Sequence, residues 1–310
     1  MRQIYFNHDG AVDDLVALFL LSQAKDIEIL GVGVVPGDCY LEPALSASEK
    51  ILNRFAPGKA IKIAPSVARP KNPFPKEWRE HAFTVDALPV LNEYEISQKL
   101  IVDQAAHLQL VDILKSADQA IDLVFTGPLS DLALALDTDS SIATKINKLY
   151  WMGGAFQAKG NVLEPEHDGS AEWNAFWDPE AVERVFQEAF PIDIVALEST
   201  EKVPLTIPIR QAWAKERKNL GIDFLGNCYA LVPPLVHQVS NSTYYLWDVL
   251  TAISYIDPSL TKKHALKAKV ATKGINQGQT YEDENGRLVD VGYDVKHAEF
   301  FQTIFNLAWQ

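Results

Sequence analysis

Short apolar runs alternate with amphipathic segments along the first two thirds of the chain. The apolar runs predict strands at Ile4–Phe6, Ile27–Val34, Ile121–Phe125, Leu149–Met152 and Ile192–Leu197. Helical periodicity between them predicts helices at Val12–Gln23, Glu42–Phe55, Leu129–Leu136 and Pro179–Phe186. Strands that alternate with helices form parallel βαβ units, and continuously apolar strands suit a sheet that is covered on both faces. The pattern therefore predicts the α/β class, with an open, mostly parallel, Rossmann-like β-sheet flanked by helices.

The chain carries no sign of a domain boundary. It contains no internal repeat, no low-complexity tract and no Gly/Ser linker, and its 310 residues are 47% hydrophobic. The proline-rich stretch from Pro65 to Pro75 is too aromatic for a linker and predicts a loop inside the fold. A chain of this size can bury one large core. We predict a single domain that spans residues 1–310.

The charge balance narrows the class of ligand. The formal net charge is −13, from 41 acidic and 28 basic residues. Such a surface repels nucleic acid and anionic membranes, so a small-molecule substrate is favoured and neither polymer nor membrane is an expected partner. Cys39 and Cys228 stand far apart without metal-type spacing, which indicates a reducing compartment. With no signal-like or membrane-spanning run, we expect a cytoplasmic protein.

Three carboxylates follow the first predicted strand within six residues. Asp9, Asp13 and Asp14 therefore lie at the carboxyl edge of the sheet, where open parallel sheets bind ligands. Two such charges about 5 Å apart repel by roughly 3 kcal/mol at an effective dielectric near 20, so something must offset that repulsion. One interpretation is the positive field of a helix N-terminus. The other is a hard divalent cation, because the available ligands are all oxygens. The local sequence leaves both open.

Several better-known motifs are excluded. Residues 31–37 imitate a dinucleotide fingerprint, but Pro36 occupies the position of its third glycine. A Walker loop, a Gly-x-Ser-x-Gly elbow and a Cys-x-x-Cys pair are absent from the sequence. A haloacid dehalogenase phosphatase would need an aspartate nucleophile at residue 7, where this chain has Asn7, which cannot form an aspartyl phosphate.

Residues 9–18 (DGAVDDLVAL) resemble the N-terminal signature of the nucleoside hydrolase family. Further segments resemble family motifs in the same order, namely TGPLS at 126–130, MGGA at 152–155, GNV at 160–162, EWN at 172–174, WDP at 177–179 and YLWDVLTA at 245–252. Residues 72–79 (NPFPKEWR) are similar to a segment of the purine-specific (inosine–adenosine–guanosine) branch. The resemblance covers the chain from about residue 4 to its end, and it implies a nucleoside hydrolase domain and fold.

The resemblance also implies a set of roles. The calcium ligands would be the side chains of Asp9, Asp14 and Asp248 and the carbonyl oxygen of Thr126, with Asp9 also the general base. Ribose would be bound by Asp13, Met152, Asn161, Glu172 and Asn174. The base would be contacted by Asp38, Glu77, Trp78 and Trp247. The expected enzyme is a purine nucleosidase that works in purine salvage, requires Ca²⁺ and forms a homodimer.

Two departures from the family pattern affect these expectations. Most members carry an aspartate where this chain has Asn7, so a negative charge close to the metal is lost. Trp247 occupies the position at which the pyrimidine-accepting branch has a histidine that protonates the leaving base. The other histidines (His81, His107, His167, His237, His264 and His297) are scattered, and none has a motif-based role. His8 should point to the opposite face of its strand from Asp9.

Without a histidine acid, a purine could be protonated at N7 from solvent while it is stacked between Trp78 and Trp247. Two alternatives remain. The enzyme could cleave another ribosyl N-glycoside, such as a pyrimidine nucleoside or nicotinamide riboside, because the ribose contacts would be the same. The chain could also be a calcium- and ribose-binding protein without turnover, although binding alone would not need the base Asp9.

Overall fold

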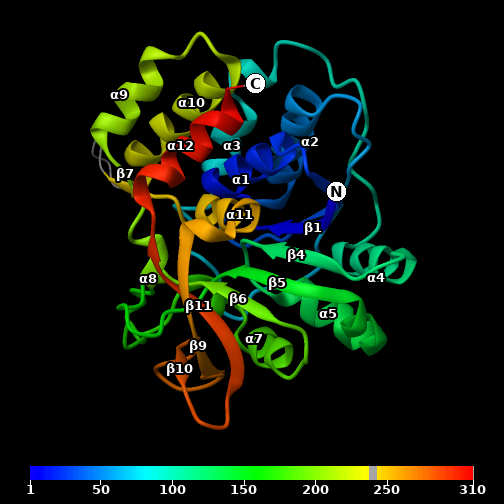
Figure 1. Cartoon of the computed structure of the whole chain (residues 1–310), viewed down its shortest axis with the longest axis vertical. Helices are drawn as coiled ribbons and strands as arrows, with labels where there is room; N and C mark the ends of the chain where they lie inside the picture. The colour runs from blue at the N-terminus through cyan, green and yellow to red at the C-terminus, as the bar shows by residue number, and fades with distance from the viewer. Residues whose placement is uncertain (237–242, 310) are drawn as a thin grey trace.

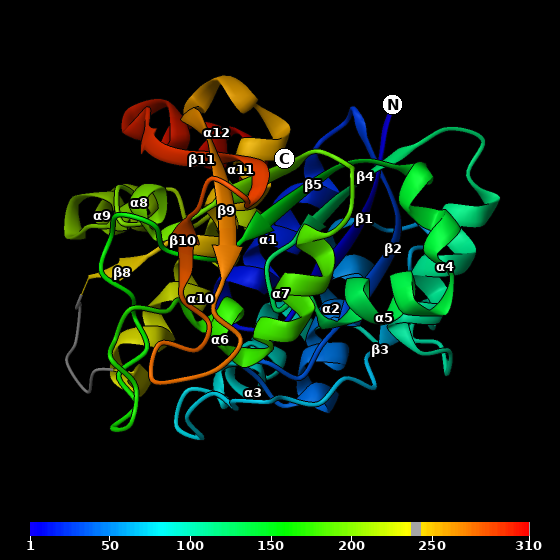
Figure 2. The same ribbon diagram turned by 90° about the horizontal axis from the view of Figure 1, so that it is seen from below.

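A long mixed sheet runs through the molecule, with helices on both faces (Figures 1 and 2). The computed structural model describes residues 1–236 and 243–309. Within these residues the main sheet has nine strands in the order β10-β9-β11-β6-β5-β4-β1-β2-β3. Their bounds are β1 Arg2–His8, β2 Ile27–Val34, β3 Lys62–Pro65, β4 Ile121–Phe125, β5 Ile146–Met152, β6 Ile192–Val195, β9 Thr261–Val270, β10 Thr280–Glu282 and β11 Arg287–Val295.

The sheet is mostly parallel, as predicted. Every neighbouring pair from β11 through β6, β5, β4, β1 and β2 to β3 is parallel, whereas β9 pairs antiparallel with both β11 and β10. This antiparallel edge was not predicted. Its longest strand, β9, mixes buried positions with more exposed ones and carries four lysines. It therefore lacks the continuous apolar run that marked the central strands.

The predicted elements recur with small changes at their ends. α1 (Val12–Gln23), β2, β4 and α7 (Pro179–Phe186) begin and end as predicted. β1 and β5 extend beyond their apolar runs, because strand pairing uses backbone groups and continues through polar residues such as Asn7 and Lys148. The predicted strand 192–197 is wrong at its end, since the chain turns at Ala196 into the short helix α8 (Leu197–Thr200).

Helices cover the two faces unequally. One face carries α1, α2 (Leu41–Phe55), α3 (His81–Asp86), α10 (Leu220–Val236), α11 (Trp247–Ile256) and α12 (His297–Ala308). The other carries α4 (Ala106–Ser116), α5 (Ser130–Thr138) and α7. The remaining elements are α6 (Trp173–Trp177), α9 (Ile207–Lys215), the small pair β7 (Pro204–Leu205) and β8 (Tyr244–Tyr245), and the 3-10 turns Pro89–Leu91, Ser140–Lys145 and Pro258–Leu260.

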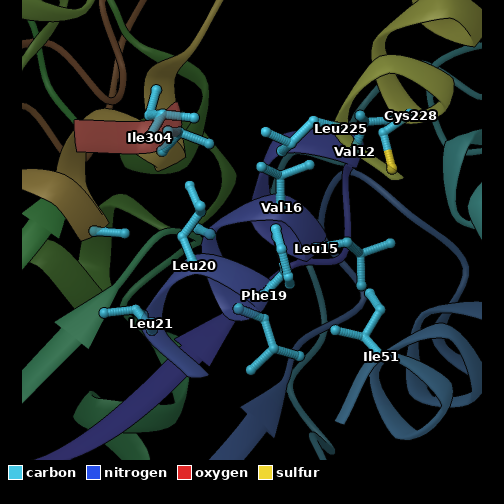
Figure 3. Packing of buried hydrophobic residues seen from close by; sticks show 14 of the residues in the cluster. Val12, Leu15, Val16, Phe19, Leu20, Leu21, Ile51, Leu225, Cys228 and Ile304 are labelled. Atoms are coloured by element: carbon cyan, nitrogen blue, oxygen red, sulfur yellow. The ribbon is translucent and has the colours of Figure 1, made fainter. Parts of the chain in front are cut away.

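α1 is the central helix of the larger core. Its side chains are buried from Val12 to Ser22, and they pack between Ile51 of α2, Leu225 of α10 and Ile304 of α12 (Figure 3). A helix that is apolar all round must be covered on every side. The acidic start of α1 is therefore fixed in place by the packing of its whole length. No described helix combines the length and the apolar composition needed to cross a bilayer.

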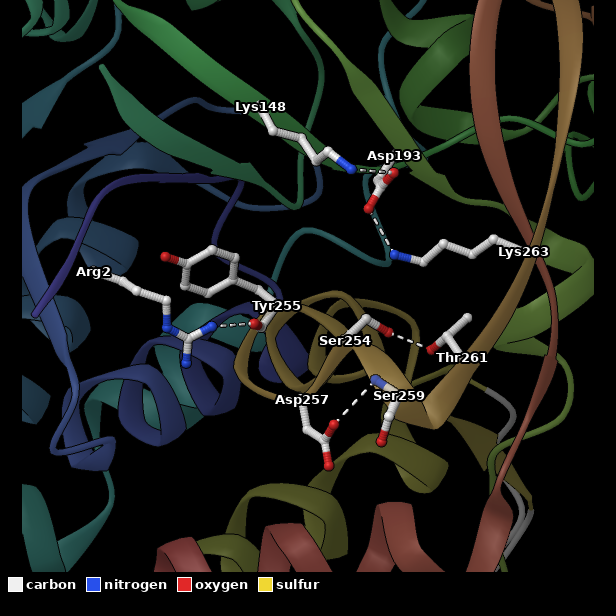
Figure 4. A network of polar contacts seen from close by, with 9 residues as sticks. All are labelled: Arg2, Lys148, Asp193, Ser254, Tyr255, Asp257, Ser259, Thr261 and Lys263. Atoms are coloured by element: carbon white, nitrogen blue, oxygen red, sulfur yellow. Dashed lines mark hydrogen bonds and ion pairs between the residues drawn. The ribbon is translucent and has the colours of Figure 1, made fainter. Parts of the chain in front are cut away.

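A polar network joins the antiparallel edge to the parallel strands (Figure 4). The buried carboxylate of Asp193 on β6 lies 3.2 Å from the Lys148 ammonium on β5 and 2.6 Å from the Lys263 ammonium on β9. Nearby, the guanidinium of Arg2 on β1 donates to the carbonyl oxygen of Tyr255, 2.8 Å away, near the end of α11. A buried charge needs partners, so these contacts fix β9 and α11 relative to the central strands.

Candidate active site

The reversal of strand order lies between β1 and β4. From β1 the chain proceeds to β2 and β3 on one side, and β4, β5 and β6 follow on the other. Asn7 pairs with Phe125 near the carboxyl ends of the two strands, so Asp9 and Thr126 both emerge at this point. Open α/β sheets bind their ligands in the crevice at such a switch point. The structure thus places the predicted site residues Asp9 and Thr126 at the switch point of the sheet.

Four buried carboxylates form one cluster at the site, and we call this cluster the carboxylate wall; three of them, Asp9, Asp13 and Asp248, line the cavity. Its members and their exposed fractions are Asp9 3%, Asp13 1%, Asp14 0% and Asp248 6%. Asp248 comes from the first turn of α11, and its backbone N–H donates to Asp13 Oδ2 at 3.0 Å. Asp14 accepts a 2.5 Å hydrogen bond from the Thr126 hydroxyl. Residues from opposite ends of the chain are thereby held in one cluster.

Two glycines allow this close approach. Gly10 has a φ of 81°, and a Cβ there would lie 2.3 Å from the Cys39 sulfur. A Cβ on Gly127 would lie 2.9 Å from Cβ of Asp9. Only glycine adopts such a φ without strain, and only glycine leaves room for the neighbouring chain. The glycines in the DGAVDD and TGPLS motifs therefore have a steric reason.

Burial dominates the electrostatics of the carboxylate wall. Burial raises the pKa of Asp9 and Asp14, and it raises the pKa of Asp13 to about 6. Burial also raises the pKa of Asp248, and the neighbouring carboxylates raise it further. Among the described residues that line the cavity beside this wall, none is lysine or arginine. Such a donor set of oxygens fits a hard cation better than it fits an isolated helix N-terminus.

Aromatic side chains form another part of the cavity lining, which we call the aromatic wall. It consists of Phe74, Trp78, Trp173 and Trp247. The Phe74 and Trp173 rings stack with centroids 4.9 Å apart, and Trp78 meets Trp173 edge to face at 5.5 Å. Trp247 packs edge to face on Tyr244, with centroids 4.8 Å apart. These rings supply an apolar surface onto which a flat ligand can stack.

The polar residues between the walls are locked by the backbone. The Glu172 carboxylate accepts hydrogen bonds from the backbone N–H groups of Gly154, Asn174 and Ala175, and burial raises its pKa to about 7. The Asn174 amide donates to the carbonyl oxygens of Thr126 at 2.9 Å and Met152 at 3.1 Å. Side chains held in this way keep their orientation before a ligand arrives.

One cavity brings most of the predicted site residues together, namely Asp9, Asp13, Asp38, Trp78, Thr126, Met152, Asn161, Glu172, Asn174, Trp247 and Asp248. Asp14 lies fully buried against Asp9 and Thr126 rather than on the cavity surface. Glu77 is exposed to solvent and is not among the lining residues, so its contact with the base stays a prediction. His8 points toward α2, with its Nε2 atom 3.2 Å from the Ser48 hydroxyl, as strand alternation predicts.

Five lining residues had no predicted role, namely Ala11, Phe74, His81, Trp173 and Tyr244. His81 is 2% exposed, and neither of its ring nitrogens has a hydrogen-bond partner among the residues that the structure describes. Burial lowers its pKa to about 4. It stands three residues after Trp78, a spacing that places both near one side of a short segment. That proximity was the available signal in the sequence. His237, another of the scattered histidines, lies outside the described residues.

Asn7 contacts a buried acidic side chain from another element. The Asn7 amide donates to Oδ2 of Asp131 on α5 at 2.9 Å, and the Ser66 hydroxyl donates to the other oxygen at 2.6 Å. Asp131 is completely buried. A carboxylate therefore does stand behind β1, but α5 contributes it. Asn7 thus keeps its hydrogen-bonding role through a buried acidic partner that lies 124 residues away in the sequence.

The fold and site together define a hydrolase-type crevice, with acidic groups suited to a polyhydroxylated sugar and rings suited to a flat base. The chain belongs to the inosine-uridine preferring nucleoside hydrolase family, whose pattern it matches over residues 4–302. It is an enzyme that hydrolyses the N-glycosidic bond of nucleosides, so the alternative of a protein without turnover is set aside.

Individual relatives agree with this assignment. The crystal structure of an inosine-uridine preferring nucleoside hydrolase from Bacillus anthracis has a TM-score of 0.92 and 54% sequence identity, and the match covers 99% of both chains. A probable uridine nucleosidase 2 of Oryza sativa is 26% identical over 286 residues, which is 91% of this chain and 82% of that protein. A pyrimidine-specific ribonucleoside hydrolase of Escherichia coli is 28% identical over 208 residues, or 66% of this chain and 62% of that one.

Proposed function

We propose that this enzyme hydrolyses purine ribonucleosides to free base and ribose with the help of one calcium ion. The observation that carries the proposal is the lining of a single cavity, which holds both buried carboxylates and aromatic rings. A ribose held by the carboxylates would leave its base in the same cavity, within reach of the rings. We also propose that the enzyme works in the cytoplasm as a homodimer.

The carboxylate wall suits calcium by its chemistry. The side chains of Asp9, Asp14 and Asp248 and the carbonyl oxygen of Thr126 would hold the ion, and all of these donors are hard oxygens. Among the described residues, no three acidic, histidine or cysteine side chains already stand in a metal-binding arrangement. Asp9, for instance, accepts a 3.0 Å hydrogen bond from the backbone of Asp38. When bound, the ion would supply a template for ribose hydroxyls and acidify the attacking water.

The protein groups around the sugar have distinct tasks. Asp9 takes the proton from the attacking water, and its position between Gly37 and Gly127 fixes the direction of its carboxylate. Glycosidic cleavage passes through a state with positive charge on the sugar. Asp13 and Glu172 face the same cavity and stabilise that charge, while Asp13 also holds a ribose hydroxyl.

The departing base carries negative charge and needs a proton. Stacking against Trp78 and Trp247 favours the protonated purine ring through a cation–π contact, so solvent can deliver the proton to N7. The stacking itself contributes only about 0.5–1.5 kcal/mol per ring pair. Most of the effect therefore comes from stabilising the protonated base in the transition state, which raises kcat rather than lowering KM.

A second candidate is a nucleoside hydrolase that also accepts pyrimidine nucleosides. The observation that favours it is His81, whose two ring nitrogens lack protein partners inside the cavity. A histidine at this place could hydrogen-bond a base that offers no N7. The names of the rice and Escherichia coli relatives, which refer to uridine and to pyrimidines, point the same way.

The two candidates are separated by measuring kcat/KM for inosine, guanosine, uridine and nicotinamide riboside on metal-stripped enzyme, with and without added calcium. A purine nucleosidase cleaves inosine and guanosine far faster than uridine, and only when calcium is present. Efficient uridine cleavage would replace the purine assignment by the second candidate. Full turnover in protein that elemental analysis shows to be metal-free would disprove the calcium requirement.

A further inference from the structure

The loop that follows β5 is held by side chains along its length. We call residues 153–158 the β5 loop. The backbone N–H of Gly154 donates to Glu172 and that of Ala155 donates to the Thr280 hydroxyl, each at 2.9 Å. The next three backbone N–H groups, at residues 156–158, all donate to a single oxygen, Oε1 of Glu198. Five consecutive N–H groups are thus captured by three side chains from different elements.

Glu198 has the largest share of these contacts. Its Oε1 lies 2.6 Å from the backbone nitrogen of Phe156 and 2.8 Å from that of Ala158, and it also accepts the bond from Gln157. Its second oxygen, Oε2, is buried and has no hydrogen-bond partner in the described structure. Successive backbone N–H groups form a concave anion-binding nest, and hydrogen bonds to a charged acceptor are about twice as strong as neutral ones. All hydrogen bonds shown for the Glu198 carboxylate in the described structure are therefore to the loop.

The β5 loop joins two predicted ribose contacts and touches the aromatic wall. It runs from Met152 at the end of β5 toward Asn161. Ala155 and Ala158 of the loop pack with Met152, Leu197 and Trp247 in one apolar cluster. Glu198 itself is not among the residues that line the cavity. Any effect of Glu198 on the ligand must therefore pass through the loop.

We infer that Glu198 is a positioning residue, which holds the β5 loop in the conformation that binds the nucleoside. Without it, three backbone N–H groups, two of them part-buried and one exposed, lose their shared acceptor, and the loop spends time in other conformations. The nucleoside then binds only the fraction of molecules whose loop has the binding conformation, and the apparent affinity is reduced in proportion to that fraction. At saturating substrate the bound loop is restored, so the loss falls on KM and leaves kcat nearly intact.

The test uses Glu198→Ala and Glu198→Gln, with Glu201→Gln as the matched control. Glu201 ends the same short helix, is exposed and makes no side-chain bond to the loop. With inosine and with p-nitrophenyl riboside, we expect Glu198→Ala to raise KM about tenfold or more and to change kcat by less than about threefold. Glu198→Gln keeps one oxygen acceptor and should recover part of the loss. The control should match the parent enzyme.

Amide hydrogen exchange of a peptide that covers residues 153–160 gives a readout that needs no catalysis. Faster exchange in the Glu198 variants, but not in Glu201→Gln, supports the proposal. Unchanged KM, or a fall in kcat at constant KM, would overturn it. If Glu198→Ala fails to fold, the KM and exchange of Glu198→Gln decide the question. The inference rests on the proposed ribose contacts. If the parent enzyme failed to cleave inosine, purine specificity would be refuted. The role of Glu198 would still be tested by p-nitrophenyl riboside and by the exchange measurement.

Discussion

The two walls of the cavity are built in different ways. The carboxylate wall comes from the end of β1 and the first turns of α1 and α11, and its four carboxylates are at most 6% exposed. The aromatic wall takes Phe74 and Trp78 from an irregular segment between β3 and α3, whereas Trp173 and Trp247 begin the helices α6 and α11. Trp78 and Trp247 are only partly buried. The carboxylates thus all belong to or directly follow regular elements, while half of the aromatic wall comes from an irregular segment.

This difference suggests how rate and specificity are divided. Groups on a sheet edge and on buried helices keep their geometry to within the tolerance that chemistry needs. Side chains on irregular segments can change with little effect on the core, so they are free to select among bases. We expect substitutions in the carboxylate wall to abolish turnover with every substrate. Substitutions in the aromatic wall should change the ranking of substrates.

The largest effect is expected from Asp9→Asn. The amide keeps the size of the side chain but cannot take the proton from water, so the chemical step should slow by about four decades, or roughly 5.5 kcal/mol of barrier. Single-turnover kinetics beside ligand titration, both at saturating calcium, separate chemistry from binding. A loss of affinity with an unchanged chemical step would assign the base to another residue.

Trp247→Ala should cost less and should depend on the substrate. We expect kcat/KM for inosine to fall about a hundredfold, near 2.7 kcal/mol, because the protonated base loses its stacking partner. With p-nitrophenyl riboside, whose leaving group needs no proton, the loss should be only several-fold. Trp309→Ala, at an exposed ring beyond α12, serves as the control. Equal losses on both substrates would mean that Trp247 only shapes the cavity.

Calcium should stabilise the protein more at high pH than at low pH. Burial raises the pKa of Asp13 to about 6 and that of Glu172 to about 7, above their values in the unfolded chain. Between about pH 4 and 7 the metal-free folded state therefore binds more protons than the unfolded state, and its stability falls as pH rises. Calcium binding needs ionised carboxylates, so it strengthens over the same range. The rise in Tm on adding calcium to stripped protein should therefore grow from pH 5 to pH 8, as measured by scanning calorimetry. A rise in Tm that is the same at every pH would contradict this prediction.

The smallest effect on purines is expected from His81→Ala. Burial lowers the pKa of His81 to about 4, so the ring is neutral at pH 7 and a poor proton donor. We expect kcat/KM for inosine to fall less than tenfold, whereas loss of a general acid removes about a hundredfold or more. Uridine hydrolysis, measured on the same two proteins, sharpens the comparison. A large loss confined to uridine would show that His81 assists the cleavage of pyrimidine nucleosides.

The candidate site could be anticipated where its residues follow regular elements. Asp9, Asp13 and Asp14 stand at fixed offsets from an apolar strand and from the helix after it, and both elements have strong periodicity. The residues that escaped prediction act across the chain. Asp131 meets Asn7 over 124 residues, and Glu198 reaches the β5 loop over about 40. Such pairs leave no local pattern in the sequence, because Asp131 and Glu198 each look like an ordinary acidic residue of a helix.

The sequence by itself determined the class of fold, the strands that carry the site and the acidic motif at the first strand end. Hydrophobic periodicity is a local property, so it is readable without coordinates. Only the tertiary structure decided which carboxylates share one cluster, that His81 enters the cavity and that Glu77 stays outside it. The antiparallel edge and its Lys148–Asp193–Lys263 contacts belong to the same category. These features depend on packing between distant segments, which fixes side-chain surroundings that no local spacing encodes.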